Sequence, residues 1–448
     1  MTLLLLLACT PDDLPPTPPE VSLSVGDIPM VPTLTWSGSD GATIRVDGSD
    51  TPPGDPSTGI PVFGLTPATD YDLIPVDADG TELPAVSFRT PDLPDGLSRT
   101  SVESNGTSTL GDGLVAVAVA AEFGSHLALV NADGIYRWWF TTAEDMTVAS
   151  PAVTLDGTGI WFAQHDRDRV ADRGIATRLS WDGRDRLDVR TPRAHHKLVE
   201  LPDGRIAYLA HTTRDIDVDG VPRTILTDRI ERVDPSLVDG DDPYESGELE
   251  PEVVFDFFDT TDPWSPCPHA DRAIDKWDYT DVYEWTHSNS LVHDADEGLF
   301  YLMSWHLDAL LAIDETSGAV TWQLGGRDGT RAFAEPGRGP FDHAHTSWVD
   351  ADQAWVFDNR VHWGGASRLV HYDLSVEPVT IEQTIFAPDY RHVGFLGDVQ
   401  PAPDGHILGG WTVPGDVAEY DADGNEVWRV LLGPGTVLGR MRYVERPW

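Results

Sequence analysis

The chain has 448 residues, 40% of them hydrophobic, and its 30 basic and 75 acidic side chains give a formal net charge of −45. The chain is too long for one ordinary hydrophobic core, which predicts two domains. The negative charge argues against nucleic acid and anionic lipid as partners. Sixteen Trp, 41 Gly and 35 Pro indicate many short strands and tight turns rather than long helices. We therefore expect an all-β protein.

The amino terminus is an apolar run that ends in Leu-Leu-Ala-Cys at residues 6–9. It resembles a bacterial lipoprotein signal, in which the Cys becomes the lipidated first residue, so residues 1–9 are predicted as that signal. The basic stretch that usually precedes such a run is missing, so we expect the true start to lie upstream of Met1. Residues 10–20, rich in Pro and Asp, predict an extended tether. We therefore expect an exported lipoprotein that is anchored through Cys9, either at the outer membrane facing the periplasm or at the cell surface.

Residues 21–92 predict a small first domain. Short alternating stretches separated by Gly, Pro and Asp turns are typical of a β-sandwich. The order Leu65, Pro67, Tyr71 and then Phe88 resembles a fibronectin type III module, with Tyr71 supplying its tyrosine corner. We expect such a module to space or dock the protein rather than to carry chemistry.

Residues 105–448 repeat themselves. One unit is an apolar strand, an Asp or Asn, a turn ending in Gly, and a strand with a Trp four residues after that Gly, as at Trp138, Trp322 and Trp428. A second unit is an Asp-Gly hairpin before an apolar strand, as at Asp203 and Asp404. Two hairpins per repeat make a four-stranded blade.

Six such repeats begin near residues 110, 148, 195, 286, 344 and 396, and long insertions interrupt them at 212–250 and 259–284. The count predicts a six-bladed β-propeller over residues 105–448, a solenoid being the main alternative. We expect the insertions to cover one face of the ring.

Three histidines occupy related places in different repeats. His196 lies seven residues before Asp203, His345 lies seven before Asp352, and His287 takes a similar place in its own repeat. Because the innermost strand of every blade lines the axis, we expect the three rings to converge. Hydrogen-bonded channel residues are one alternative and a metal site is another. The chain has no His-Glu-x-x-His spacing, so we predict neither a metal nor a cofactor.

Several motifs, in order along residues 105–448, resemble the bacterial aryl-sulfate sulfotransferases. The resemblance rests on His-His-Lys at 195–197, Trp-Thr-His-Ser-Asn-Ser at 285–290, Val-Thr-Trp-Gln-Leu-Gly-Gly at 320–326, Phe-Asp-Asn at 357–359 and Gly-Asp-Val-Gln at 397–400. It implies a six-bladed propeller that moves a sulfuryl group from a phenolic sulfate ester to a phenolic acceptor through a sulfated histidine, without a nucleotide donor. The implied partners are thus a small aromatic sulfate ester and a phenol.

The same resemblance implies roles for individual residues. His345 matches the nucleophile, His287 and Asn289 match the sulfonate-binding pair, and His196 matches the remaining channel histidine, with His195 the less favoured choice. Neutral imidazole as nucleophile, donors around the sulfonate oxygens and an acid for the departing phenolate are what such a transfer needs.

One position departs from the family pattern. An Arg usually follows Ser after the His-x-Asn motif, but here Trp305 stands in that place, and an indole cannot replace a guanidinium fork. His306, Arg360 or Arg391 would have to compensate. The predicted substrate-binding residues are His195, Trp305, His306 and Arg360.

Two other functions remain open from the sequence. The first is a non-catalytic, lipid-anchored propeller that binds or scaffolds, which Trp305 favours. The second is a quinone-dependent propeller dehydrogenase, since its blades also carry a Gly-x-x-x-Trp repeat. Six repeats rather than eight, and the channel histidines, argue against the second.

Overall fold

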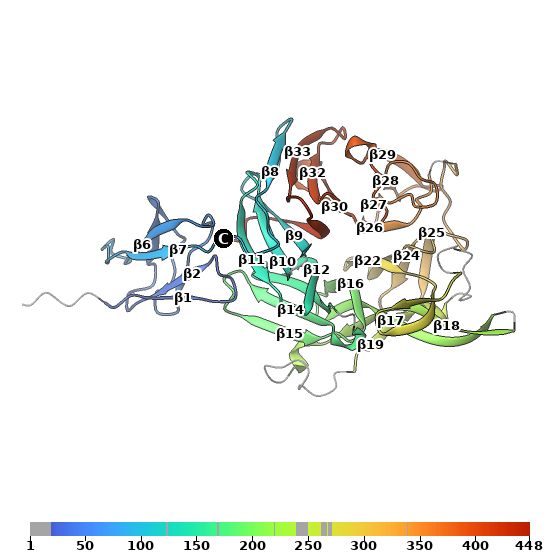
Figure 1. Ribbon diagram of the computed structural model, residues 1–448, viewed down its shortest axis with the longest axis horizontal. Helices are drawn as coiled ribbons and strands as arrows, with labels where there is room; N and C mark the ends of the chain where they lie inside the picture. The colour runs from blue at the N-terminus through green and yellow to red at the C-terminus, as the bar shows by residue number, and fades with distance from the viewer. Residues whose placement is uncertain are drawn as a thin grey trace, which may run out of the picture.

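The computed structural model describes residues 19–121, 124–167, 170–218, 220–238, 250–260, 267, 271–337 and 339–448. The predicted signal, Cys9 and most of the tether lie outside these residues and stay predictions. Strands joined by tight turns dominate the described part (Figure 1), so the all-β prediction is confirmed. The helices there are short 3-10 turns, at Ala171–Arg173, Pro235–Leu237, Phe257–Asp259, Pro388–Tyr390 and Pro403–Gly405. None of these described helices has the length and apolar character needed to cross a bilayer.

Two small antiparallel sheets form the amino-terminal region, at the blue end of Figure 1. The hydroxyl of Tyr71 accepts a hydrogen bond from the backbone N–H of Thr66 at 2.9 Å, which fixes the chain ahead of its strand. The domain boundaries and the fibronectin type III assignment stay predictions. The sheets contain β1 (Ser22–Val25), β2 (Pro32–Thr35) and β5 (Ile60–Pro61), and β4 (Ser49–Asp50), β3 (Thr43–Val46), β6 (Asp70–Val76) and β7 (Val86–Arg89).

Six larger sheets follow within the described residues, and Figure 1 shows them side by side around a centre. The first three are β9 (Leu114–Ala121), β10 (Gly124–Asn131) and β11 (Tyr136–Thr141); β12 (Met146–Val153), β13 (Gly159–Asp166), β14 (Ile175–Ser180) and β15 (Arg186–Arg190); and β16 (Ala194–Glu200), β17 (Ile206–Val218), β18 (Val221–Val233), β19 (Glu252–Asp256), β20 (Ile274–Lys276) and β21 (Tyr279–Glu284). The last three are β22 (Ser288–Asp294), β23 (Leu299–Ser304), β24 (Ala309–Asp314) and β25 (Val320–Gly325); β26 (Ala344–Val349), β27 (Gln353–Asp358), β28 (Arg368–Asp373) and β29 (Thr380–Phe386); and β30 (Asp398–Pro401), β31 (Ile407–Trp411), β32 (Asp416–Tyr420) and β33 (Glu426–Leu431).

Strands from both ends of this region close the ring. The last strand, β34 (Val437–Val444), pairs with β9 and becomes the inner strand of the first sheet. The early strand β8 (Ser101–Ser104) pairs with β33 as the outer strand of the last sheet. Neighbouring inner strands then touch in a continuous circuit, β12–β16–β22–β26–β30–β34–β12. Closure brings the ends of six inner strands to one axis.

The repeated Trp residues join neighbouring sheets. The indole N–H of Trp138 donates to the carbonyl of Trp181 in the next sheet, and that of Trp428 donates to the carbonyl of Ala132, each at 2.8 Å. Both rings are buried, and a buried indole N–H needs such a partner. The spacing of these Trp residues in the sequence therefore corresponds to an anchoring role between sheets.

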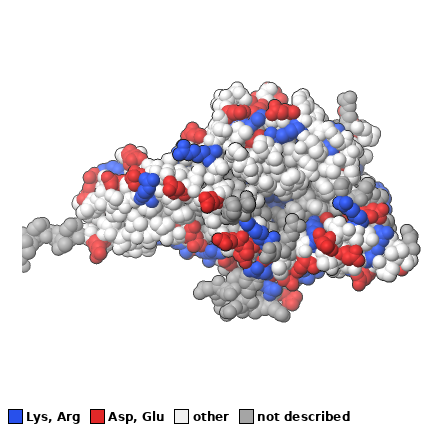
Figure 2. All heavy atoms as spheres, viewed as in Figure 1, with Lys and Arg blue, Asp and Glu red and all other residues white. Residues whose placement is uncertain are grey.

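The two insertions lie on the third sheet. The first lengthens the hairpin β17–β18, and β21 of the second pairs in parallel with β18 through Thr224 and Val282. Lys276 and Cys267 of the second insertion reach residues next to the predicted histidines, so this insertion lies at the histidine end of the ring. Figure 2 shows acidic and basic side chains interspersed over one face of the molecule rather than gathered in a single patch.

Candidate active site

A β-bulge at the start of three inner strands, β16, β22 and β26, positions the predicted residues. The pairing of β26 passes from Ala344 directly to Thr346, which leaves His345 out of the ladder. Asn289 is left out of β22 in the same way, and β16 loses its pairing at His196 and Lys197. A bulge bends its strand and re-aims the unpaired residue. It therefore turns these side chains toward the axis.

The register corrects one detail of the sequence reading. His345 and His196 both sit in bulges, as their matched spacing predicts. His287 instead stands two residues before its bulged residue, in the place that His343 takes before His345. Both His287 and His343 adopt a left-handed backbone, with φ of 49° and 54°. Non-glycine residues rarely adopt this conformation, and it concentrates at functional sites.

The structure brings the three predicted histidines together. The ring of His196 lies 5.9 Å from that of His287 and 5.9 Å from that of His345, centroid to centroid. Burial, reinforced by the other charged groups of the site, holds the pKa of all three imidazoles well below the usual range. The cluster is therefore neutral at pH 7.

His345 has a defined tautomer. Its Nδ1 lies 3.1 Å from the backbone carbonyl of Gly397, and a carbonyl only accepts, so Nδ1 carries the proton. Nε2 of the neutral ring then keeps its lone pair. His345 is 3% exposed, so this nitrogen lies in a largely water-excluded centre where the pKa is lowered by burial and then by Arg440.

Two further groups at the centre provide donors. Asn289 is fully buried, and neither polar atom of its amide has a hydrogen-bond partner among the described residues. Arg440 of β34 is 3% exposed and donates to the backbone carbonyl of Asn289. Burial, partly offset by Asp398, lowers the pKa of Arg440 to about 10, so the guanidinium stays charged at neutral pH. A buried amide without partners beside a buried cation can bind the oxygens of an anion.

A buried chain of side chains stands behind His196. Nδ1 of His195 lies 2.8 Å from Nδ1 of His196, and Nε2 of His195 lies 3.1 Å from a carboxylate oxygen of Asp228. Burial alone would raise the pKa of Asp228, but the contact with His195 and the hydroxyl of Thr286 outweigh it and lower that pKa. Asp228 is therefore ionised and can hold a proton on His195, which the direct Nδ1–Nδ1 contact can pass to His196.

The second insertion supplies a cation at His287. Nδ1 of His287 lies 2.9 Å from a carboxylate oxygen of Glu284 and 3.5 Å from Nζ of Lys276, and the Lys and Glu pair with each other. The backbone carbonyl of the same Glu accepts from Nδ1 of His306 at 2.9 Å. Burial and then Lys276 hold the pKa of His287 well below its usual range.

The predicted substitutes for the family's Arg differ in position. Trp305 and His306 lie at the site, with ring centroids 4.9 and 5.0 Å from that of His287. Arg391 pairs with Asp416, and in the part of the chain that the structure describes no hydrogen bond or ion pair joins its side chain to the three histidines. Within the described residues, no hydrogen bond or ion pair joins the side chain of Arg360 to them, so its substrate-binding role stays a prediction.

Sequence reasoning missed Arg440. The pair Arg440 and Arg442, alternating along the final strand of a very acidic chain, is the signal that was present. Its meaning depends on β34 returning to the first sheet, a pairing that no local pattern reveals. Together with Lys197 the two arginines line a cavity of about 480 Å³, whose lining does not include His196, His287 or His345.

A scan against family models matches residues 263–433 to the arylsulfotransferase (ASST) family. No curated protein matches. Similar solved structures include a protein of unknown function from Bacteroides caccae (13% identity, 75% of this chain and 100% of that chain, TM-score 0.44). Another is TolB from Acinetobacter baumannii (12% identity, 86% of this chain and 81% of that chain, TM-score 0.44). A third is the Cps50 (Swd1) β-propeller domain of Myceliophteria thermophila (12% identity, 78% of this chain and 87% of that chain, TM-score 0.39).

These TM-scores lie below 0.5, so the fold rests on the strand pairing described above. The family match covers β22 to β33 and with them His287, Asn289 and His345. It supports a sulfotransferase activity in general. The match over residues 263–433 thus supports the resemblance to the arylsulfotransferase family predicted from the sequence.

Proposed function

We propose that this protein is an exported, lipid-anchored aryl sulfotransferase whose six sheets form the blades of a β-propeller behind a fibronectin type III-like sandwich. It moves a sulfuryl group from a phenolic sulfate ester to a phenol through a sulfated His345. The observation that carries the proposal is the tautomer of His345. Because its Nδ1 donates to Gly397, the basic nitrogen is the one left to attack at the centre of the histidine cluster.

The transfer takes two balanced steps. In the first, Nε2 of His345 forms a bond to sulfur while the bond from sulfur to the aryl oxygen breaks. The departing phenolate takes the Nε2 proton of His196, while Nδ1 of His196 takes the Nδ1 proton of His195. In the second, the acceptor phenol returns a proton to Nε2 of His196, whose Nδ1 proton returns to His195, and the phenol oxygen attacks sulfur, which breaks the S–N bond and restores His345. Asp228 and His195 support the proton on His196 through the contacts of 3.1 and 2.8 Å.

The negative charge on the sulfonate oxygens needs donors that are already in place. Arg440 supplies a buried charge, and Asn289 supplies an amide N–H without another partner among the described residues. His287 stands on the other side of the cluster, next to Lys276. Such fixed donors in a site with little water account for most of the catalysis in comparable group transfers.

Trp305 favours the alternative of a non-catalytic binding protein, because the family's Arg is absent at that position. Arg440 weighs against this alternative, since it provides a guanidinium beside His345 from a different strand. A ligand that binds without being turned over would support the alternative.

The test is to trap the sulfated histidine. Wild-type protein is mixed with excess p-nitrophenyl sulfate without an acceptor, quenched, and analysed by peptide mass spectrometry under conditions that preserve S–N bonds. We expect a mass increase of one SO₃ group on the peptide that contains His345, release of p-nitrophenol in a burst, and loss of both in His345→Ala. The matched control is His371→Ala on β28, whose ring bonds Gln353 away from the centre and should not affect the burst. A wild-type protein that binds aryl sulfates but gives neither burst nor adduct would overturn the proposal.

A further inference from the structure

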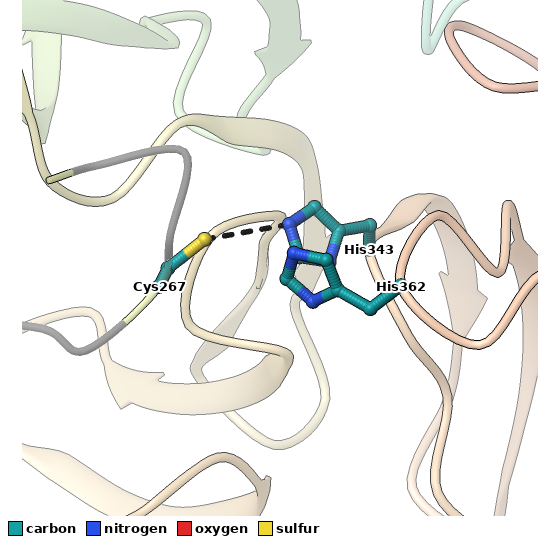
Figure 3. Close-up of side chains that lie close together, drawn as sticks. All are labelled: Cys267, His343 and His362. Atoms are coloured by element: carbon teal, nitrogen blue, oxygen red, sulfur yellow. Dashed lines mark hydrogen bonds between the residues drawn. The ribbon is translucent and has the colours of Figure 1, made fainter. Parts of the chain in front are cut away.

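A second group of side chains, Cys267, His343 and His362, lies on the far side of Trp305 from His287. Each offers one ligand atom, and these atoms lie within 4.8 Å of one another. Figure 3 shows Cys267 facing the two imidazoles. The distance from Sγ of Cys267 to Nε2 of His343 is 3.5 Å. The three residues come from the second insertion, the start of β26 and the segment after β27.

The distances and ring angles suit a tetrahedral metal ion. With Zn–S and Zn–N bonds of about 2.3 and 2.0 Å, tetrahedral geometry places sulfur and nitrogen about 3.5 Å apart. The observed separation of Cys267 and His343 agrees. The rings of His343 and His362 have centroids 4.1 Å apart and planes at 73°, so both can direct an in-plane lone pair to one point.

Another buried histidine cluster does not meet this requirement. His195, His211 and Asp228 also bring possible ligand atoms together. However, the rings of His195 and His211 are stacked, 4.0 Å apart with planes only 13° from parallel. A single ion cannot lie in both ring planes. That cluster therefore fits the proton chain described above and not a metal.

A carboxylate orients both imidazoles of the first cluster. Nδ1 of His343 lies 2.9 Å from Oδ1 of Asp342 and 3.2 Å from Oδ1 of Asp308, and Nδ1 of His362 lies 3.5 Å from the same oxygen of Asp342. The backbone N–H groups of His362 and Trp363 hold the other oxygen of Asp342, each at 2.7 Å. Carboxylates in this position are typical of metal-binding histidines, because they fix the ring and leave Nε2 as the ligand atom.

We propose that Cys267, His343 and His362 bind one zinc ion, with its fourth coordination position open to water or to a substrate oxygen. A thiolate and two neutral imidazoles are ligands that zinc prefers, and three protein ligands with an open position are typical of reactive zinc sites. Binding displaces the thiol proton of Cys267 and the Nε2 proton of His343, and it leaves Nδ1–H of His343 on its carboxylates. The ion ties the second insertion to the ring, next to Trp305, whose ring lies 4.2 Å from that of His343.

This inference is independent of sulfuryl transfer and departs from the sequence-based prediction of no metal. The spacing of these ligands matches no short zinc motif, because 76 residues separate Cys267 from His343 and 19 separate His343 from His362. Only the fold of the insertion brings the thiol to the ring.

Metal binding to the full chain tests the proposal without any enzymatic assay. Chelator-treated wild-type protein is titrated with Zn²⁺ against a chromophoric chelator and, separately, with Co²⁺, whose thiolate charge-transfer band in the near ultraviolet reports a Co–S bond. We expect one ion per chain and a Co–S band. Cys267→Ser and His362→Ala should each weaken Zn²⁺ binding by at least about 10-fold, and Cys267→Ser should abolish the band.

Two variants serve as controls. Cys9→Ser replaces the only other Cys in the sequence, and His392→Ala removes an exposed imidazole. Both should bind like wild type. His362 has a side chain 31% exposed, so its replacement leaves the core intact and keeps the test valid if Cys267→Ser folds poorly. Wild-type protein that binds no stoichiometric metal, or a Co–S band or Zn²⁺ affinity unchanged in Cys267→Ser, would overturn the proposal.

Discussion

His343 and His345 stand two residues apart at the start of one strand, and both are almost fully buried, yet without a bound metal their charges differ. Burial disfavours the charged form of each ring. At His343 the carboxylates of Asp308 and Asp342 outweigh burial and raise the pKa to about 11. At His345 the partners are the carbonyl of Gly397 and the cation Arg440, and the pKa lies well below its usual range. The groups that face each ring, a neighbouring residue included, decide which histidine is a base.

Trp305 lies between these two environments. Its ring is 4.2 Å from that of His343 and 4.9 Å from that of His287, so it separates the histidine beside carboxylates from the neutral cluster. A guanidinium in its place would lie next to His343 and the proposed zinc site. The cation at the centre instead comes from Arg440, on the opposite side of the ring of inner strands. This comparison predicts which substitutions should matter.

Among the variants that follow, Arg440→Gln is expected to cause the largest loss of activity. It removes the charge that stabilises the sulfonate oxygens and keeps His345 unprotonated, so kcat for aryl sulfate turnover should fall by about 10²–10³-fold. Arg442→Gln is the matched control, because Arg442 lies two residues along β34 and bonds Gln400 at 2.7 Å. Its effect on kcat should stay within a few-fold. Equal losses in both variants would mean that Arg440 acts through strand packing and that the loss of the family's Arg is not compensated.

A smaller effect is expected for Asp228→Asn. The carboxylate of Asp228 contacts His195, and His195 contacts His196. Removing the carboxylate therefore weakens the proton supply from His195 to His196. We expect kcat to fall about 10–100-fold for sulfate esters of weakly acidic phenols, by analogy with other orienting carboxylates.

The leaving group distinguishes a proton-transfer role of Asp228 from a structural one. Esters of strongly acidic phenols need little protonation, so Asp228→Asn should affect them much less, and a plot of rate against phenol pKa should become steeper. The same loss for every ester would contradict the role of Asp228 in proton transfer.

The sequence predicted the parts of the site that repeat. The hairpin spacing located the inner strands, and the motif match identified His287, Asn289 and His345, which the structure places together with His196 at the axis. Spacing alone did not show that His287 and His343 share one register. That equivalence depends on where each bulge falls, and a bulge has no strong local signature.

The parts that the sequence did not predict depend on long-range pairing. Arg440 reaches the centre because β34 closes onto β9, more than 300 residues earlier in the chain. Cys267 reaches His343 because the insertion folds back along β18. Arg391 seemed a suitable cation, but its charge is already paired with Asp416.

The smallest expected effect concerns stability and pH. His196 faces His195, His287, His345 and Arg440, and burial followed by these groups holds its pKa well below that of an unfolded His. The folded state therefore resists protonation. The contribution of the neutral His196 to the free energy of unfolding is fully present above about pH 6.5. It is lost as pH falls below that value, by up to about 1 kcal/mol per pH unit. Denaturant unfolding between pH 7.5 and 5 should show this loss in wild type and in the exposed control His392→Gln, with a shallower slope in His196→Gln. A slope that stays the same in His196→Gln would mean that this ring is already protonated, and the neutral cluster on which the comparison rests would have to be abandoned.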